Sequence, residues 1–259
     1  MTKLKALIFD VDGTIADTEQ YGHRVAFNLA FGEAGWAWDW SVPLYGELLT
    51  VAGGKERIRF YLDQYHPNFQ PSNDLDEFIA NLHKIKTQHY QKLVAKGEIP
   101  LRPGVKRLLA KAKREGIRLA IATTAALPNV TALLETNLGS DSLSWFEVIA
   151  AGDIVPAKKP APDIYYYVLR EMGLQASDCL VIEDSEQGLK AAKAAGLNTI
   201  ITLNDYTQNH DFSDAILVLN HLGEPDQPFN VLAGDAGDAS YVDMALLHYL
   251  YEKGVGSGE

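Results

Sequence analysis

Two aspartates separated by one residue, Asp10 and Asp12, follow the short apolar run Leu7–Phe9. The run has the length of a buried strand and is too short for a buried helix. Because strand residues alternate between faces, both carboxylates are expected on one side of the strand end, with Gly13 allowing the chain to turn. Like charges this close repel and raise each other's pKa. A pair of turn residues is the alternative, but the pattern favours a bound cation or a chemical role.

From Pro100 onward, apolar strand-like segments alternate with helical patterns. This alternation predicts a parallel sheet with helices on both faces, in which ligands bind at the carboxyl ends of the strands. A final helix is expected over residues 241–251. The expected strands are 118–124, 146–151, 179–182 and 199–203, and the expected helices are 105–114, 128–138, 162–172 and 186–195.

Polar residues that suit phosphoryl transfer follow these strands. Taken singly, the threonines fit an ordinary strand end, the lysines a solvated loop and the acids a helix N-cap. At matching positions of one sheet edge, together with the first motif, they indicate a common site. They are Thr123 and Thr124, then Lys158 and Lys159 before Pro160, and then Glu183 and Asp184.

Each of these side chains has an expected role. Asp10 is the candidate nucleophile, which would form an aspartyl phosphate, and Asp12 is the candidate general acid and base. Thr123 would hold phosphate oxygens, and Lys159 would place a positive charge where negative charge accumulates. Mg²⁺ prefers oxygen ligands, and it would screen the nucleophile from the phosphate. Its candidate ligands are Asp10, the backbone carbonyl of Asp12, Asp184, and Glu183 directly or through water.

The stretch between the first strand and Pro100 has helical spacing and little strand signal. We therefore expect an all-helical cap inserted into the α/β core, with a first helix capped by Asp17 or Thr18. The expected core comprises residues 1–16 and 100–259, and the expected cap comprises residues 17–99.

Composition narrows the class of protein. Of 259 residues, 47% are hydrophobic and 22% charged, as in ordinary globular proteins, and the formal net charge is −11. That charge argues against nucleic acid or an anionic membrane as partner, and no apolar run is long enough to span a membrane. An anionic substrate would need local cations. The only cysteine, Cys179, allows no intrachain disulfide, so a cytoplasmic location is expected. We expect a monomer.

The chain resembles the haloacid dehalogenase superfamily of phosphatases, in the subgroup with a helical cap after the first strand. The resemblance rests on four motifs in order, which are D-V-D-G-T at 10–14, A-T-T at 122–124, K-K-P-A-P-D at 158–163 and V-I-E-D-S-x-x-G-L at 181–189. Within the superfamily it is similar to the CbbY group. The segments that carry this similarity are 17–19, 44–49, 53–57, 83–87, 102–105 and 122–130.

That resemblance implies a Rossmann-like core and hydrolysis of the 1-phosphate of xylulose-1,5-bisphosphate, a Rubisco inhibitor, to xylulose 5-phosphate. The second phosphate of such a substrate would need cations in the cap, which is expected to close over it. For each of the cap residues named next, the alternative is an ordinary position on the solvated surface. The candidate substrate-binding residues of the cap are Glu19, Gly53, Gly54, Lys55, Arg57 and Lys86, beside Thr123 and Thr124 of the core.

Three alternatives remain open. A phosphoglycolate phosphatase or a β-phosphoglucomutase would share the superfamily's motifs. The mutase pattern places a histidine directly after a tyrosine of the first cap helix, whereas Tyr21 is followed here by Gly22 and then His23. A non-catalytic sugar-phosphate binder is the alternative from a different class.

Overall fold

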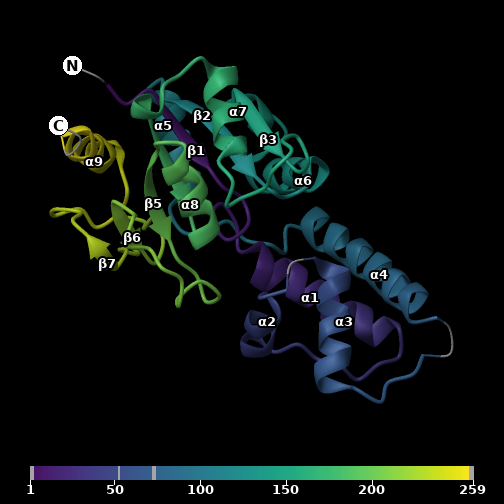
Figure 1. Cartoon of the computed structure of the whole chain (residues 1–259). Coiled ribbons are helices and arrows are strands. Elements are labelled where there is room, and N and C mark those ends of the chain that lie inside the picture. Colours follow the sequence, from purple (N-terminus) through teal and green to yellow (C-terminus); the bar gives the residue numbers. More distant parts are fainter. Residues whose placement is uncertain (1–2, 52, 72–73, 257–259) are drawn as a thin grey trace. The chain divides into compact units, whose positions relative to one another are not determined.

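The computed structural model describes residues 3–51, 53–71 and 74–256 (Figure 1). Its contacts divide the chain into two compact units. The core unit is Met1–Asp17 with Pro100–Glu259, and the cap unit is Thr18–Ile99.

The core unit is built on one mostly parallel sheet, which confirms the expected α/β class. The strand order is β3-β2-β1-β4-β5-β6-β7, and every neighbouring pair is parallel except β6 with β7. The first strand of the chain therefore lies between β2 and β4, and the segments that follow these three strands meet at one edge. The strands are β1 (Ala6–Phe9), β2 (Arg118–Thr123), β3 (Val148–Ala151), β4 (Cys179–Glu183), β5 (Asn198–Thr202), β6 (Leu217–Leu219) and β7 (Val231–Gly234).

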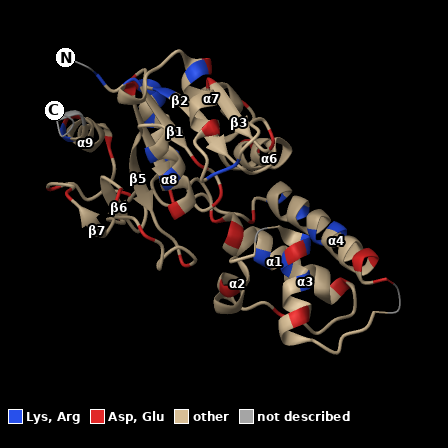
Figure 2. Ribbon diagram, viewed as in Figure 1, with Lys and Arg blue, Asp and Glu red and all other residues tan. Residues whose placement is uncertain are grey.

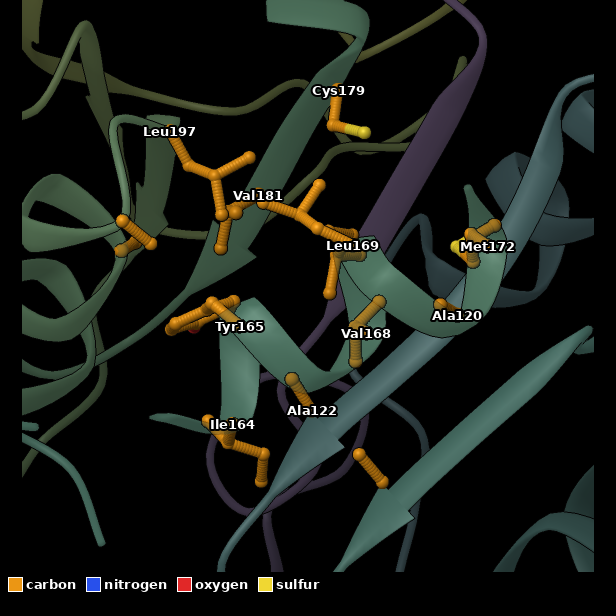
Figure 3. Packing of buried hydrophobic residues seen from close by; sticks show 14 of the residues in the cluster. Ala120, Ala122, Ile164, Tyr165, Val168, Leu169, Met172, Cys179, Val181 and Leu197 are labelled. Carbon is orange, nitrogen blue, oxygen red and sulfur yellow. The ribbon is translucent and has the colours of Figure 1, made fainter. Parts of the chain in front are cut away.

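Helices of the core connect these strands and cover the sheet. Those helices are α5 (Val105–Arg114), α6 (Leu127–Leu138), α7 (Asp163–Met172), α8 (Glu186–Ala194) and α9 (Met244–Gly256). One buried face of α7 packs with alternate residues of β2 and β4 (Figure 3). In that cluster Tyr165 of α7 lies near the strand residues Ala122 and Val181, and all three are fully buried. Packing of α7 thus fixes the segment that follows Pro160.

The cap unit is all-helical. It begins with a π-helix, η1 (Thr18–His23), and continues with α1 (Arg24–Glu33), α2 (Val42–Leu48), α3 (Gly54–Tyr65) and α4 (Leu75–Ala95). Its interior is aromatic, with Phe27 in contact with Trp40 at a ring-centroid distance of 4.5 Å and Trp40 with Tyr61 at 5.3 Å. Asp74 caps α4 by accepting two backbone N–H groups. Apolar burial and this cap explain why the region folds as helices.

Four details differ from the expectations. The strand expected to begin at residue 146 begins at Val148, because Ser142–Trp145 forms a 3₁₀ helix before it. β6 and β7 were not expected, and β7 is exposed throughout. The last helix begins at Met244 rather than at residue 241. The α-helix expected after Asp17 begins only at Arg24, with His23 at its N-cap position, because Thr18–His23 forms a π-helix before it.

Among the described residues, no helix is both long enough and apolar enough to cross a membrane.

Candidate active site

Asp10 is fixed by backbone pairing at the end of β1. Its N–H donates to Ile182 O at 3.0 Å, which extends the pairing with β4 by one residue beyond the strand. The sequence led us to expect that strand alternation positions the two aspartates. This is wrong, because β1 ends at Phe9. Asp12 instead lies in a tight loop, in which Gly13 N–H donates to Ala16 O at 2.8 Å. The loop, rather than a strand face, places the second carboxylate.

Lys159 joins the first carboxylate to the end of β4. Its Nζ donates to Asp10 Oδ1 at 2.7 Å, to Glu183 Oε1 at 2.5 Å and to Ala122 O at 2.8 Å. Only 6% of the Lys159 side chain is exposed. Residues that are distant in sequence are thus held together by one buried cation, and salt screens such an interaction far less than a surface pair.

Asp184 joins the two acids that Lys159 binds. One carboxylate oxygen from each of Asp10, Glu183 and Asp184 lies within 4.8 Å of the others, and all three residues are buried. Burial raises the pKa of Asp10 to about 7, against the opposing effect of Lys159, while Glu183 and Asp12 add to the rise. Burial, with the charges of Asp10 and Glu183, also raises the pKa of Asp184 well above its usual value.

This set of side chains fits a divalent cation. When ionised, the three buried carboxylates carry more negative charge than Lys159 and the nearby Arg102 balance, and carboxylate oxygens are the preferred ligands of Mg²⁺. Asp10 and Asp184 are the best candidates for direct ligands. Both oxygens of Glu183 accept hydrogen bonds from within the protein, including Tyr165 Oη at 2.9 Å on Oε1 and Asp184 N–H at 3.1 Å on Oε2. Glu183 therefore suits a supporting role better than direct coordination.

The two threonines after β2 differ in their surroundings. Thr123 is buried, and its Oγ1 accepts the N–H of Ala125 at 3.2 Å, so the hydroxyl shapes the turn after the strand. Thr124 is exposed. Lys158 is also exposed and pairs with Asp153, unlike its buried neighbour in the sequence. Of the two lysines, only Lys159 enters the site.

Sequence reasoning missed two side chains that hold the acids. Tyr165 donates to Glu183 from the buried face of α7, and it looked like an ordinary core aromatic. Asn204 donates from Nδ2 to Asp184 Oδ2 at 2.7 Å. It follows the strand expected at 199–203, so reading the residues after that strand, as was done for the others, would have found it.

In the cap unit, one hydrogen-bonded chain connects η1, α2 and α3. Tyr45 Oη donates to Glu19 Oε2 at 2.6 Å, and Arg57 donates from Nη1 to Tyr45 Oη at 3.1 Å. The Arg57 guanidinium also donates to the carbonyls of Leu48 and Val51, both at 3.2 Å. Arg57 is therefore a buried, held cation rather than a solvated one.

A second cluster of the cap surrounds two histidines. Lys86 is 8% exposed, and its Nζ lies 2.9 Å from His23 Nδ1. Burial lowers the pKa of His23 well below 6.5, and Lys86 and Arg57 lower it further. Burial, Lys86 and Lys55 likewise lower the pKa of His83. Lys86 thus acts on both rings, Arg57 on His23 and the exposed Lys55 on His83.

Two glycines open α3 beside this cluster. Gly53 has φ +92, and a Cβ on Gly54 would lie 2.5 Å from His83 Nε2. No larger residue fits at Gly54 without displacing the ring. Basic residues recur on α1, α3 and α4, amid acidic ones (Figure 2).

Comparisons with known proteins agree with this geometry. The family model described as haloacid dehalogenase-like hydrolase matches residues 4–196. Protein CbbY of Cupriavidus necator is 49% identical over 225 residues, which cover 87% of this chain and 88% of that protein. The crystal structure of CbbY from Rhodobacter sphaeroides in complex with phosphate has a TM-score of 0.71 and 47% identity, covering 84% of this chain and 94% of that one.

A structure of the D10N mutant of the same Rhodobacter sphaeroides protein, in complex with xylulose-(1,5)bisphosphate, matches equally well. Its TM-score is 0.71 and its identity 46%, over 84% of this chain and 94% of that one. With a family model that spans most of the chain and relatives that share nearly half of its residues, the chain belongs to the haloacid dehalogenase-like hydrolase family, as a phosphatase of the CbbY type.

Proposed function

We propose that this protein is a Mg²⁺-dependent phosphatase that releases the 1-phosphate of xylulose-1,5-bisphosphate and leaves xylulose 5-phosphate. The observation that carries the proposal is the buried Asp10, held by Lys159 beside Asp184 and Glu183. The substrate is suggested by the relative whose structure contains xylulose-(1,5)bisphosphate.

Asp10 is the nucleophile in this proposal. One of its oxygens bonds to phosphorus while the bond to the sugar oxygen breaks, and water then attacks the aspartyl phosphate to release inorganic phosphate. Asp12, half-buried on the same loop, donates a proton to the leaving sugar oxygen and later accepts one from the attacking water. Lys159 keeps Asp10 oriented and supplies positive charge beside it.

Mg²⁺, when bound, offsets the repulsion between a carboxylate and a phosphate. Asp10, the carbonyl of Asp12 and Asp184 are the proposed ligands, with Glu183 as support. Thr123 and Thr124 are proposed to contact phosphate oxygens through the turn after β2, where the Thr123 hydroxyl accepts a backbone N–H.

The cap residues are proposed to recognise the rest of the substrate. Arg57 and Lys86 are buried cations with fixed hydrogen bonds, which lowers the entropic cost of binding a second phosphate. Lys55 adds an exposed positive charge, and Gly53 and Gly54, the first of them exposed, are proposed to let the backbone approach the substrate. Glu19 is proposed to accept hydrogen bonds from sugar hydroxyls.

Hydrolysis is favoured over a mutase reaction by the packing at Gly22. A Cβ there would lie 2.7 Å from Ile99 Cδ1 and 2.8 Å from Tyr90 Cε2, so a histidine would fit only if these neighbours moved. The neighbouring His23 is buried, stacks on Tyr90 at 4.2 Å and binds Lys86 through Nδ1. Neither position presents the histidine that the mutase pattern requires.

A substrate panel tests the proposal. Phosphate release is measured from xylulose-1,5-bisphosphate, phosphoglycolate and β-glucose 1-phosphate, with Mg²⁺ or with a chelator. We expect the highest kcat/KM for the bisphosphate, loss of turnover with the chelator, and no turnover by Asp10→Asn. Faster release from either of the other substrates would overturn the substrate assignment. Binding of the bisphosphate without any release would indicate a non-catalytic binder.

A further inference from the structure

Asn204 presents a donor of fixed orientation to the acidic cluster. Its Nδ2 donates to Asp184 Oδ2 at 2.7 Å, while its Oδ1 accepts the backbone N–H of Tyr206 at 2.9 Å. Because a backbone N–H can only donate, the carbonyl side of the amide must face Tyr206 and the NH₂ side must face the carboxylate. The backbone N–H of Asn204 also donates to Thr207 Oγ1 at 3.0 Å. Its own loop therefore sets the orientation of this amide.

Gly13 packs directly against the same hydrogen bond. A Cβ on Gly13 would lie 2.7 Å from Asn204 Nδ2 and would also collide with Asp184 Oδ2. The φ of Gly13 is +82, a conformation that other residues rarely adopt. The loop that carries Asp12 thus packs against the hydrogen bond between Asn204 Nδ2 and Asp184 Oδ2. Asp184 itself is 7% exposed.

We propose that Asn204 is a positioning residue that holds Asp184 by Oδ2 and leaves Oδ1 for the cation. The inference rests on the proposed function, because it assumes that Asp10 and Asp184 bind Mg²⁺. A carboxylate fixed by one oxygen cannot rotate freely, so its second oxygen is already oriented when the ion arrives. Removing such an outer hydrogen-bond partner weakens metal binding by about 10- to 100-fold in other metal sites.

The experiment measures Mg²⁺ affinity directly, by isothermal titration of MgCl₂ into metal-free protein. Asn204→Ala removes the amide, whereas Thr207→Val removes a hydrogen bond of the same loop and keeps the amide. We expect the Mg²⁺ dissociation constant to rise by about 10- to 100-fold in Asn204→Ala and much less in Thr207→Val. Melting temperatures of the metal-free variants, measured in parallel, report the structural cost of each change.

The outcomes are distinct. A rise confined to Asn204→Ala, with a metal-free melting temperature no lower than that of Thr207→Val, supports the positioning role. Equal Mg²⁺ affinities in wild type and Asn204→Ala, or equal weakening in both variants, would overturn this inference and leave the proposed function intact. No binding heat in wild type, or an unchanged heat in Asp184→Asn, would overturn the proposed metal site and the inference with it.

Discussion

Replacing Lys159 by Met should destabilise the core unit more than any nearby surface change. Methionine keeps an unbranched stem in the packed site and removes the charge, so two carboxylates lose their shared cation. Nζ has three acceptors at 2.5–2.8 Å, and the Asp10 and Glu183 side chains are 10% and 0% exposed. Breaking a buried ion pair on one side costs about 3–5 kcal/mol, because an uncompensated charge stays buried. We expect a loss of that size without metal.

The assay is urea unfolding in the presence of a chelator, with amide hydrogen exchange of β1 and β4 as the measurement specific to the core. Lys158→Met is the matched control, because that lysine pairs with Asp153 at the surface, where the two side chains are 53% and 89% exposed. An exposed pair contributes about 0–1 kcal/mol. Equal losses in the two variants would refute the buried network. The double variant Lys159→Met/Glu183→Gln should recover part of the loss, because it also removes one buried charge.

Three further variants test other parts of the structure. His23→Gln should flatten the pH dependence of cap stability. Because the pKa of His23 in the folded protein lies below 6.5, the wild type loses stability as the pH falls through about 6.5, by at most about 1.4 kcal/mol per pH unit. Equal slopes of stability against pH in wild type and His23→Gln would contradict this. Gly22→Ala should cost about 1–3 kcal/mol in thermal unfolding by overpacking, whereas Gly32→Ala, with open space, should be neutral or stabilising; similar values would refute the packing. Tyr165→Phe should lower the free energy of unfolding in urea by about 1.5–3 kcal/mol, because the buried hydroxyl donates to Glu183. Tyr166→Phe, at an exposed tyrosine, should lower it by less than about 0.5 kcal/mol, and the reverse order would disprove the role given to the Tyr165 hydroxyl.

The parallel sheet and the helical cap could be predicted from the sequence because their apolar patterns are local. Buried strands, helical periodicity and Gly or Pro boundaries need no knowledge of distant residues. β6 is a buried Leu-Val-Leu run, so it did show a local apolar pattern, which we passed over. β7 was missed for a physical reason. β7 is an exposed edge strand, so its residues show no core pattern, and its pairing with β6 depends on contacts that the sequence does not display.

Within the site, the acids and Lys159 could be selected because they follow predicted strands. The strand register then brings Asp10 beside Ile182 and hence near Glu183, which is a consequence of topology. The hydrogen bonds that orient these groups could not be predicted. Tyr165 reaches Glu183 only through the packing of α7, and the place of Asp12 depends on loop bonds rather than strand alternation.

The central claim is that Asp10 itself attacks the phosphorus. It is tested most directly by rapid acid quench of enzyme mixed with xylulose-1,5-bisphosphate and Mg²⁺, followed by mass spectrometry of the peptides. The account predicts a transient phosphoryl group on Asp10 that forms before phosphate appears and is absent in Asp10→Asn. Phosphate release by Asp10→Asn at the wild-type rate, or a phosphoryl group on another residue, would contradict it.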